Sequence, residues 1–224
     1  MKKPYISVII PTLNEQRNIG KVIDGVKQVL KDYNYEIILV DKHSADKTVE
    51  IAKAKGARIL YEGLGKGYAL RKGFKNARGK ILISMDADLS NRPNELRLLI
   101  SGIETGYDVC MGSRFLTGGG SEDMPRFRRL GNKAFVMLVN FFFKSHYTDL
   151  CYGYRSLTRS AAKRLKLTST GFGIETELGI KAKKEGLKVL EVPSFEKKRV
   201  YGTGKLNSFH DGYVILKTIF ANLF

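Results

Sequence analysis

The chain has 224 residues, of which 43% are hydrophobic, and this composition suits one folded α/β domain, or one domain with an appendage. Its 39 Lys and Arg against 22 Asp and Glu give a formal net charge of +17, and residues 111–224 hold 20 of the basic residues but only 9 of the acidic ones. Such a charge favours a phosphate-bearing partner, whether a nucleotide, a nucleic acid or an anionic bilayer, whereas the spacing of Cys110 and Cys151 indicates neither a disulfide framework nor a zinc site.

Strand-like and helical segments alternate through the first half of the chain. Apolar β-branched runs indicate buried strands, and apolar residues at helical spacing indicate helices. The predicted strands cover residues 5–10, 35–40, 57–61 and 80–85, and the predicted helices cover residues 18–30, 46–56, 68–77 and 93–105. This alternation predicts an α/β fold with a mostly parallel central sheet and helices on both faces.

The order of elements becomes less regular after the fourth strand. A strand is expected at residues 108–115, and a glycine-rich loop follows it at 117–125. The apolar runs at 134–143 and 213–224 fall short of the roughly 20 residues of a spanning helix. Each run is expected to form either a buried helix or an interfacial helix at a membrane. The boundary near residue 110 is expected to separate functions rather than independently folding domains.

Polar clusters stand where three of the predicted strands end: PTLNE at 11–15, DKHSADKT at 41–48 and DADLS at 86–90. Ligands of open parallel sheets bind beyond the carboxyl ends of the strands. One crevice is therefore expected to hold four carboxylates, those of Glu15, Asp41, Asp86 and Asp88. Such carboxylates repel each other unless a cation or the hydrogen-bond donors of a ligand receive them. An Asp-x-Asp that leaves a strand suits a divalent metal ion.

Six motifs in order along nearly the whole chain carry a family resemblance. They read SVIIPTLNE, VDKHSADKT, GLGKGYALRKGFKNARGKILISMDADL, GSRF, DLCYGYRSL and RVYGTGKL. Together they resemble the family 2 glycosyltransferases of GT-A fold, and within them the polyprenyl-phosphate (dolichol-phosphate) mannose and glucose synthases. The resemblance implies a single GT-A catalytic domain over residues 1–224, in which 1–110 binds the nucleotide sugar and the basic half, 111–224, binds the acceptor and faces the membrane.

The activity that the resemblance implies is a metal-dependent, inverting hexosyl transfer. Mannose or glucose would pass from GDP-mannose or UDP-glucose to a polyprenyl (dolichyl) phosphate. The implied contacts to the nucleotide sugar are Pro11, Leu13, Glu15, Val40, Asp41, Asp86 and Ala87. The family usually has a second acidic residue after Asp41, where this chain has Lys42, so the contact to the nucleobase is expected to differ.

The resemblance also implies a metal site and a set of catalytic residues. Asp86 and Asp88 match the metal-binding DxD of the family, and Ser90 stands at a position that often adds a ligand. Mg²⁺ or Mn²⁺ is the implied cofactor, and these hard ions prefer the oxygen ligands that Asp-x-Asp supplies. The implied catalytic residues are Asp88, then Arg114 as a donor-site or acceptor-phosphate contact, and Arg199 with Lys205 as a basic pair on a loop that closes over the phosphates.

The need for a catalytic base depends on the acceptor. A hydroxyl acceptor must lose a proton during attack, whereas a lipid phosphate is already an anion at neutral pH. Glu175 and Glu177 are expected to lie in the first turn of a helix, where acids complement the helix dipole, and Asp149 is expected to pair with Arg155. No base is therefore assigned, and we expect none.

Basic residues frame the apolar run at 134–143, which suits the surface of an anionic membrane. They are Arg126, Arg128, Arg129, Lys133 and Lys144. No cleavable signal precedes the first strand, so the protein is expected in the cytoplasm, peripherally at the cytoplasmic face of the membrane. Many relatives append transmembrane helices, so a chain that stops at Phe224 is expected to rely on peripheral contact or to be a catalytic fragment.

Three alternatives remain beside this hypothesis. The acceptor could be a glycan or another hydroxyl compound, in which case activity would gain little from an isoprenoid chain. A nucleic-acid-binding protein would explain the charge, but the acidic cluster would repel a phosphate backbone. A dinucleotide-dependent oxidoreductase is suggested by GLGKG at 63–67, but its fingerprint should follow the first strand.

Overall fold

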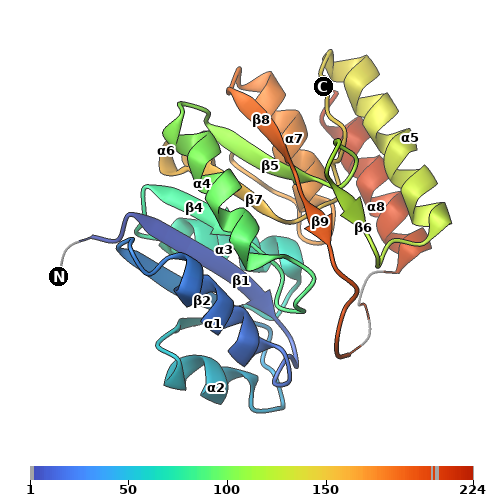
Figure 1. Cartoon of the computed structure of the whole chain (residues 1–224). Helices are drawn as coiled ribbons and strands as arrows, with labels where there is room; N and C mark the ends of the chain where they lie inside the picture. Colours follow the sequence, from blue (N-terminus) through green and yellow to red (C-terminus); the bar gives the residue numbers. More distant parts are fainter. Residues whose placement is uncertain (1–2, 203, 205–206, 224) are drawn as a thin grey trace.

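The computed structural model describes residues 3–202, 204 and 207–223, and its centre is a seven-stranded sheet (Figure 1). The strand order is β3-β2-β1-β4-β7-β5-β8. The strands are β1 (Ile6–Thr12), β2 (Tyr35–Asp41), β3 (Arg58–Tyr61), β4 (Ile81–Ser84), β5 (Val109–Ser113), β7 (Arg155–Thr158) and β8 (Val189–Pro193). Strands β1 to β4 pair in parallel, as do β5 and β8, whereas β7 runs antiparallel between β4 and β5. The predicted mostly parallel sheet is confirmed.

Helices cover both faces of the sheet. Side chains alternate between the faces along a strand, so Val8 and Ile10 pack with α1, α2 and α4, while Ile9 and Ile38 pack on the other face with α3, α6 and α7. Helices α5 and α8 lie side by side at one end of the molecule (Figure 1). The helices are α1 (Ile19–Val29), α2 (Thr48–Ala54), α3 (Lys66–Asn76), α4 (Leu96–Glu104), α5 (Arg126–Phe143), α6 (Arg159–Arg164), α7 (Ile174–Lys184) and α8 (Ser208–Ala221).

The second half contains the two expected helices and short strands that the sequence patterns did not indicate. The apolar run at 134–143 is part of the longer helix α5, and residues 213–221 of the second run are part of α8. A short parallel pair, β6 (Gly120–Ser121) and β9 (Phe195–Glu196), joins the glycine-rich loop to the segment that leads into α8. No helix in the described part of the chain is long and apolar enough to cross a bilayer. Cys110 and Cys151 are both free thiols.

The glycines of GLGKG allow two backbone segments to approach closely. A Cβ on Gly67 would lie 2.4 Å from the carbonyl oxygen of Ser169, and one on Gly65 would lie 2.7 Å from that of Thr170. The Gly67 amide donates to the Thr170 carbonyl at 3.0 Å. The motif therefore packs the start of α3 against the loop before α7. Because this amide is already used, the geometry weighs against a dinucleotide phosphate bound at this turn.

Candidate active site

A cavity of about 740 Å³ opens at the carboxyl ends of β1 and β4 and extends to the α5 and α8 pair. Its wall contains residues of both halves of the chain. It includes most of the residues expected from the sequence: Pro11, Leu13, Glu15, Val40, Asp86, Ala87, Asp88, Ser90, Arg114 and Arg199. Lys205, the remaining expected catalytic residue, lies outside the described residues.

Asp41 does not lie on the wall of this cavity, and the expected crevice of four carboxylates is wrong in this respect. The Asp41 side chain is 0% exposed. Its carboxylate accepts hydrogen bonds from the Thr12 hydroxyl at 3.0 Å, the Ser44 amide at 2.7 Å and the Ser44 hydroxyl at 2.6 Å. These bonds fix the turn after β2. Lys42, the next residue, lines the cavity instead.

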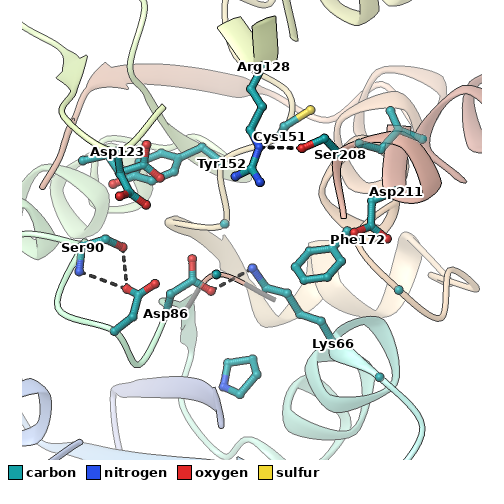
Figure 2. A pocket seen from close by; sticks show the side chains of 18 of the residues that line it. Lys66, Asp86, Ser90, Asp123, Arg128, Cys151, Tyr152, Phe172, Ser208 and Asp211 are labelled. Carbon is teal, nitrogen blue, oxygen red and sulfur yellow. Dashed lines mark hydrogen bonds and ion pairs between the residues drawn. The ribbon is translucent and has the colours of Figure 1, made fainter. Parts of the chain in front are cut away.

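Asp86 and Asp88 stand in the turn that follows β4. Asp88 Oδ1 accepts from the hydroxyl of Ser90 at 2.6 Å and from its amide at 3.0 Å (Figure 2). The amide of Asp86 donates to the side-chain oxygen of Asn91 at 2.7 Å, and the Asn91 side-chain amide donates to the Tyr152 hydroxyl at 2.9 Å. The DxD turn is therefore held by its own sequence neighbours, and Tyr152 supports it from the second half of the chain.

Two cations each bridge a pair of carboxylates in the cavity. Arg199 lies 2.6 Å from Asp88 Oδ2 and 3.3 Å from Glu15 Oε1. Lys66 Nζ lies 2.8 Å from Asp86 Oδ1 and 2.9 Å from Glu175 Oε1. The sequence patterns placed Glu175 only in the first turn of a helix, which α7 confirms, and assigned no role to Lys66.

The charge of Lys66 is stabilised by this arrangement. Burial alone would lower the pKa of its amine, but the charges of Asp86 and Glu175 outweigh burial and raise the pKa above its usual value. Figure 2 shows the Lys66 amine and the Asp86 carboxylate pointing toward each other beside the Phe172 ring. A permanent positive charge therefore stands beside the first aspartate of the DxD motif.

The donor set suits a hard divalent cation. Asp86, Asp88 and Ser90 offer oxygen atoms, and Arg199 already places a cation 2.6 Å from Asp88. In the described ranges no group of three or more His, Cys, Asp or Glu side chains forms a metal cage by itself. Mg²⁺ is commonly bound by one or two carboxylates together with substrate phosphates, so two carboxylates and a hydroxyl fit such an ion when a diphosphate completes its shell.

Arg114 lines the cavity, but two carboxylates neutralise the charge of its guanidinium group. Its guanidinium contacts Asp149 at 2.7 and 3.0 Å and Glu196 at 3.1 Å, and it lies 4.6 Å from the centre of the Tyr152 ring. The expected pair of Asp149 with Arg155 is therefore wrong. Arg155 is buried and instead donates to the backbone carbonyls of Leu150, Tyr152 and Glu175.

The far end of the cavity lies between α5 and α8, and its polar lining was not recognised in the sequence. Arg128 Nε donates to the Ser208 hydroxyl at 2.9 Å (Figure 2). Asn132, one helical turn further along α5, is only 4% exposed, and neither polar atom of its side chain has a partner among the described residues. Asp211 accepts from the amide of Asn207 at 2.8 Å. The spacing of Arg128 and Asn132 by four residues was the available signal, since it places both on one helix face.

Comparison with known proteins places these features in a family. The protein-family model described as Glycosyl transferase family 2 matches residues 7–166. A dolichol-phosphate mannosyltransferase of Pyrococcus furiosus is 33% identical over 226 residues; the match covers 97% of this chain and 61% of that relative. A dolichyl-phosphate hexose transferase of Haloferax volcanii is 32% identical over 215 residues, which cover 96% of this chain and 92% of the relative.

A solved structure confirms the predicted GT-A fold. Glucosyl-3-phosphoglycerate synthase of Mycobacterium tuberculosis, crystallised with Mn²⁺, UDP-glucose and phosphoglyceric acid, matches with a TM-score of 0.78 and 22% sequence identity. The match covers 98% of this chain and 80% of that structure. At this identity the likeness concerns the fold.

Proposed function

This chain belongs to glycosyl transferase family 2, and we propose that it transfers a hexose from a nucleotide sugar to a polyprenyl phosphate, with inversion at the anomeric carbon and with Mg²⁺ or Mn²⁺. The observation that carries the proposal is one cavity with an acidic end at the DxD turn and a polar end at Arg128 and Asn132. Residues 1–110 would bind the donor, and residues 111–224 would bind the acceptor. Family membership also favours an enzyme over a nucleic-acid-binding protein.

The acidic end of the cavity supports the donor site. Asp86, Asp88 and the Ser90 hydroxyl would hold the cation, once Arg199 leaves Asp88. A divalent cation held there would neutralise the charge that develops on the departing diphosphate. Arg199 would then be free to bind a phosphate oxygen of the donor, because a guanidinium forms strong charge-assisted bonds to phosphate.

The polar end of the cavity supports a phosphate acceptor. Arg128 supplies positive charge, and the buried amide of Asn132 supplies a hydrogen-bond donor that no described residue uses. A phosphate anion in this place would attack the anomeric carbon directly and needs no base. The carboxylates considered from the sequence are all paired: Asp149 with Arg114, Glu175 with Lys66 and Glu177 with Lys181 at 2.7 Å.

The outer face of α5 and α8 supports contact with a lipid surface. Four exposed apolar side chains on α5 recur at intervals of three, seven and four residues and therefore share one helix face: Phe127, Leu130, Met137 and Phe141. Phe209 and Tyr213 are exposed on α8. Arg126, Arg129 and Lys133 on α5 are also exposed. Apolar and basic side chains alternate on this face, and Phe127 also lines the cavity. An anionic bilayer bound to this face would therefore lie next to the acceptor end of the cavity.

A glutamate on the outer face of α5 should weaken membrane binding. The variants Leu130→Glu and Phe141→Glu are expected to weaken binding to phosphatidylserine-containing vesicles by about tenfold or more, because burying one such side chain is worth about 1.5–3 kcal/mol. Vesicle flotation measures this binding. Leu98→Glu on α4 is the matched control, since Leu98 is exposed on the other side of the sheet. Equal binding by all three variants would contradict the membrane-facing assignment.

A thermal-shift panel tests the donor site. GDP-mannose, UDP-glucose, UDP-N-acetylglucosamine and NAD are each added with and without Mn²⁺, because a ligand that binds only the native state raises the melting temperature. We expect one nucleotide sugar to raise it only when the metal is present, and NAD to have no effect. An unchanged melting temperature with every nucleotide sugar and metal would contradict the proposed donor site. It would indicate that Lys42 alters this site.

A further inference from the structure

Residues 197–201 form a strap across the acidic end of the cavity. The strap follows β9 and leads toward α8 (Figure 1). At its start the Lys197 amide donates to the carbonyl of Ser90, in the DxD turn, at 2.9 Å. At its end the Tyr201 carbonyl accepts from the side-chain amide of Asn18 at 3.3 Å, and Asn18 directly precedes α1. The strap therefore spans from the turn after β4 to the beginning of α1.

The ring of Tyr201 is held by two cations at the start of α1. The guanidinium carbon of Arg17 lies 4.1 Å from the centre of the ring, and Lys21 Nζ lies 5.6 Å from it. Both distances are within the range of cation–π attraction. Arg17 and Lys21 are four positions apart, so their side chains stand next to each other along the helix. Tyr201 therefore docks the end of the strap on a preformed basic pair.

Arg199, two residues before Tyr201, takes the place beside Asp88 that a metal ion would need. One carboxylate oxygen of Asp88 accepts from Ser90, and the other lies 2.6 Å from the Arg199 guanidinium. Both oxygens are engaged, so a metal ion must compete with the guanidinium. Arg199 Nε is buried and has no partner among the described residues, which is costly for an N–H donor. The guanidinium is thus incompletely satisfied on Asp88, and a further contact is needed to keep it there.

We propose that Tyr201 latches the strap to α1 and thereby keeps Arg199 on Asp88, so that the protein resists a metal ion that arrives without a donor. This rests on the proposed function, because it requires that Asp88 holds the metal. Tyr201 is then a positioning residue, which acts through Arg199. The strap has two contacts with different tasks: the Arg199 guanidinium competes with the metal ion, and the Tyr201 ring sets how often the guanidinium is in place.

Loss of the Tyr201 ring should change metal binding without any change of charge. Tyr201→Leu removes both cation–π contacts, so the docked strap becomes less populated. The apparent affinity for a ligand rises with the fraction of the protein that is able to bind it. Mn²⁺ alone should therefore bind about threefold or more tightly, because one cation–π contact at an exposed site is worth about two- to fivefold in an equilibrium constant. Tyr201→Phe keeps the ring and should bind Mn²⁺ as the wild-type chain does.

Electron paramagnetic resonance of free Mn²⁺ measures this affinity on the whole chain without nucleotide. Arg199→Met removes the competing guanidinium and should tighten Mn²⁺ binding by about tenfold or more. Lys198→Met is the matched control, because it removes the same charge from an exposed position of the strap, and it should change the affinity by less than about twofold. Unchanged or weaker binding by Tyr201→Leu, equal tightening by Tyr201→Phe, or an Arg199→Met affinity no higher than that of Lys198→Met would overturn the proposal.

A variant on the other side of the latch covers the case in which Tyr201→Leu does not fold. Arg17 is exposed, and Arg17→Met should tighten Mn²⁺ binding by about twofold or more. Without metal, trypsin should also cut this variant after Lys198 about twofold faster, because an undocked segment is open to proteolysis. Unchanged Mn²⁺ affinity, or tighter binding without faster cleavage, would overturn the latch. Failure of the wild-type and Arg199→Met chains alike to bind Mn²⁺, with or without a nucleotide, would instead overturn the proposed metal site.

Discussion

Replacing Asp88 by Asn is expected to abolish sugar transfer, lowering it by at least about 100-fold, while the chain still folds. Asn has nearly the shape of Asp, and its side-chain oxygen still accepts the bonds that Ser90 donates to Asp88. What is lost is the negative charge beside Arg199, where the metal is proposed to bind. Without the metal, the charge that develops on the leaving diphosphate is not neutralised.

The measurement is the initial rate of transfer from the nucleotide sugar identified by the thermal-shift panel, over a range of Mn²⁺ concentrations. Thermal unfolding of the same preparations shows whether the fold is intact. Asp24→Asn is the matched control, because Asp24 is exposed on α1 and pairs only with Lys55 at 2.7 Å among the described residues. Full activity of Asp88→Asn with Mg²⁺ or Mn²⁺ present would refute the metal assignment.

Replacing Arg128 by Met is expected to lower kcat/KM for a polyprenyl phosphate by about tenfold to a hundredfold, since a charge-assisted hydrogen bond contributes about 1.5–3 kcal/mol. Asn132→Ala should have a similar but smaller effect, because the amide is neutral. Neither change should alter the stabilisation by the nucleotide sugar and metal, because both residues lie at the other end of the cavity from the DxD turn.

The Arg128 variant needs a control for the general attraction between the basic half and a lipid. Arg129→Met removes the same charge from the exposed side of the same helix. With a short-chain isoprenyl phosphate in detergent, Arg128→Met should lose activity and Arg129→Met should not. An equal loss in both variants would show that the basic residues of α5 act only through overall charge, and the acceptor-phosphate site would then be wrong.

The elements of the first half could be read from the sequence because their signals are local. Apolar β-branched runs gave β1, β2 and β4, and helical spacing gave α1. Since parallel strands end at one edge of a sheet, the turns that carry Glu15, Asp86 and Asp88 could be placed together before their geometry was known. The prediction failed for Asp41, because Thr12 at the end of β1 and Ser44 in the turn after β2 satisfy its carboxylate.

The rest of the site depends on contacts between residues that are far apart in the sequence, and composition and periodicity do not report these. Lys66 meets Glu175 more than 100 positions away, and Arg114 meets Asp149 and Glu196 rather than leaving Asp149 to the nearer Arg155. The antiparallel strand β7 lies between two strands that precede it in the chain. Each of these pairings depends on the packing of the whole fold.

The most direct test of the proposed function is transfer of a radiolabelled hexose to lipid. The chain is incubated with labelled GDP-mannose or UDP-glucose, a polyprenyl phosphate and Mn²⁺, and the label that enters the organic phase is counted with and without EDTA. We expect that label from one donor enters the organic phase, that EDTA stops this transfer, and that a longer isoprenoid chain increases it. Metal-dependent transfer of label only to a soluble hydroxyl acceptor, with none to polyprenyl phosphate from either donor, would contradict it.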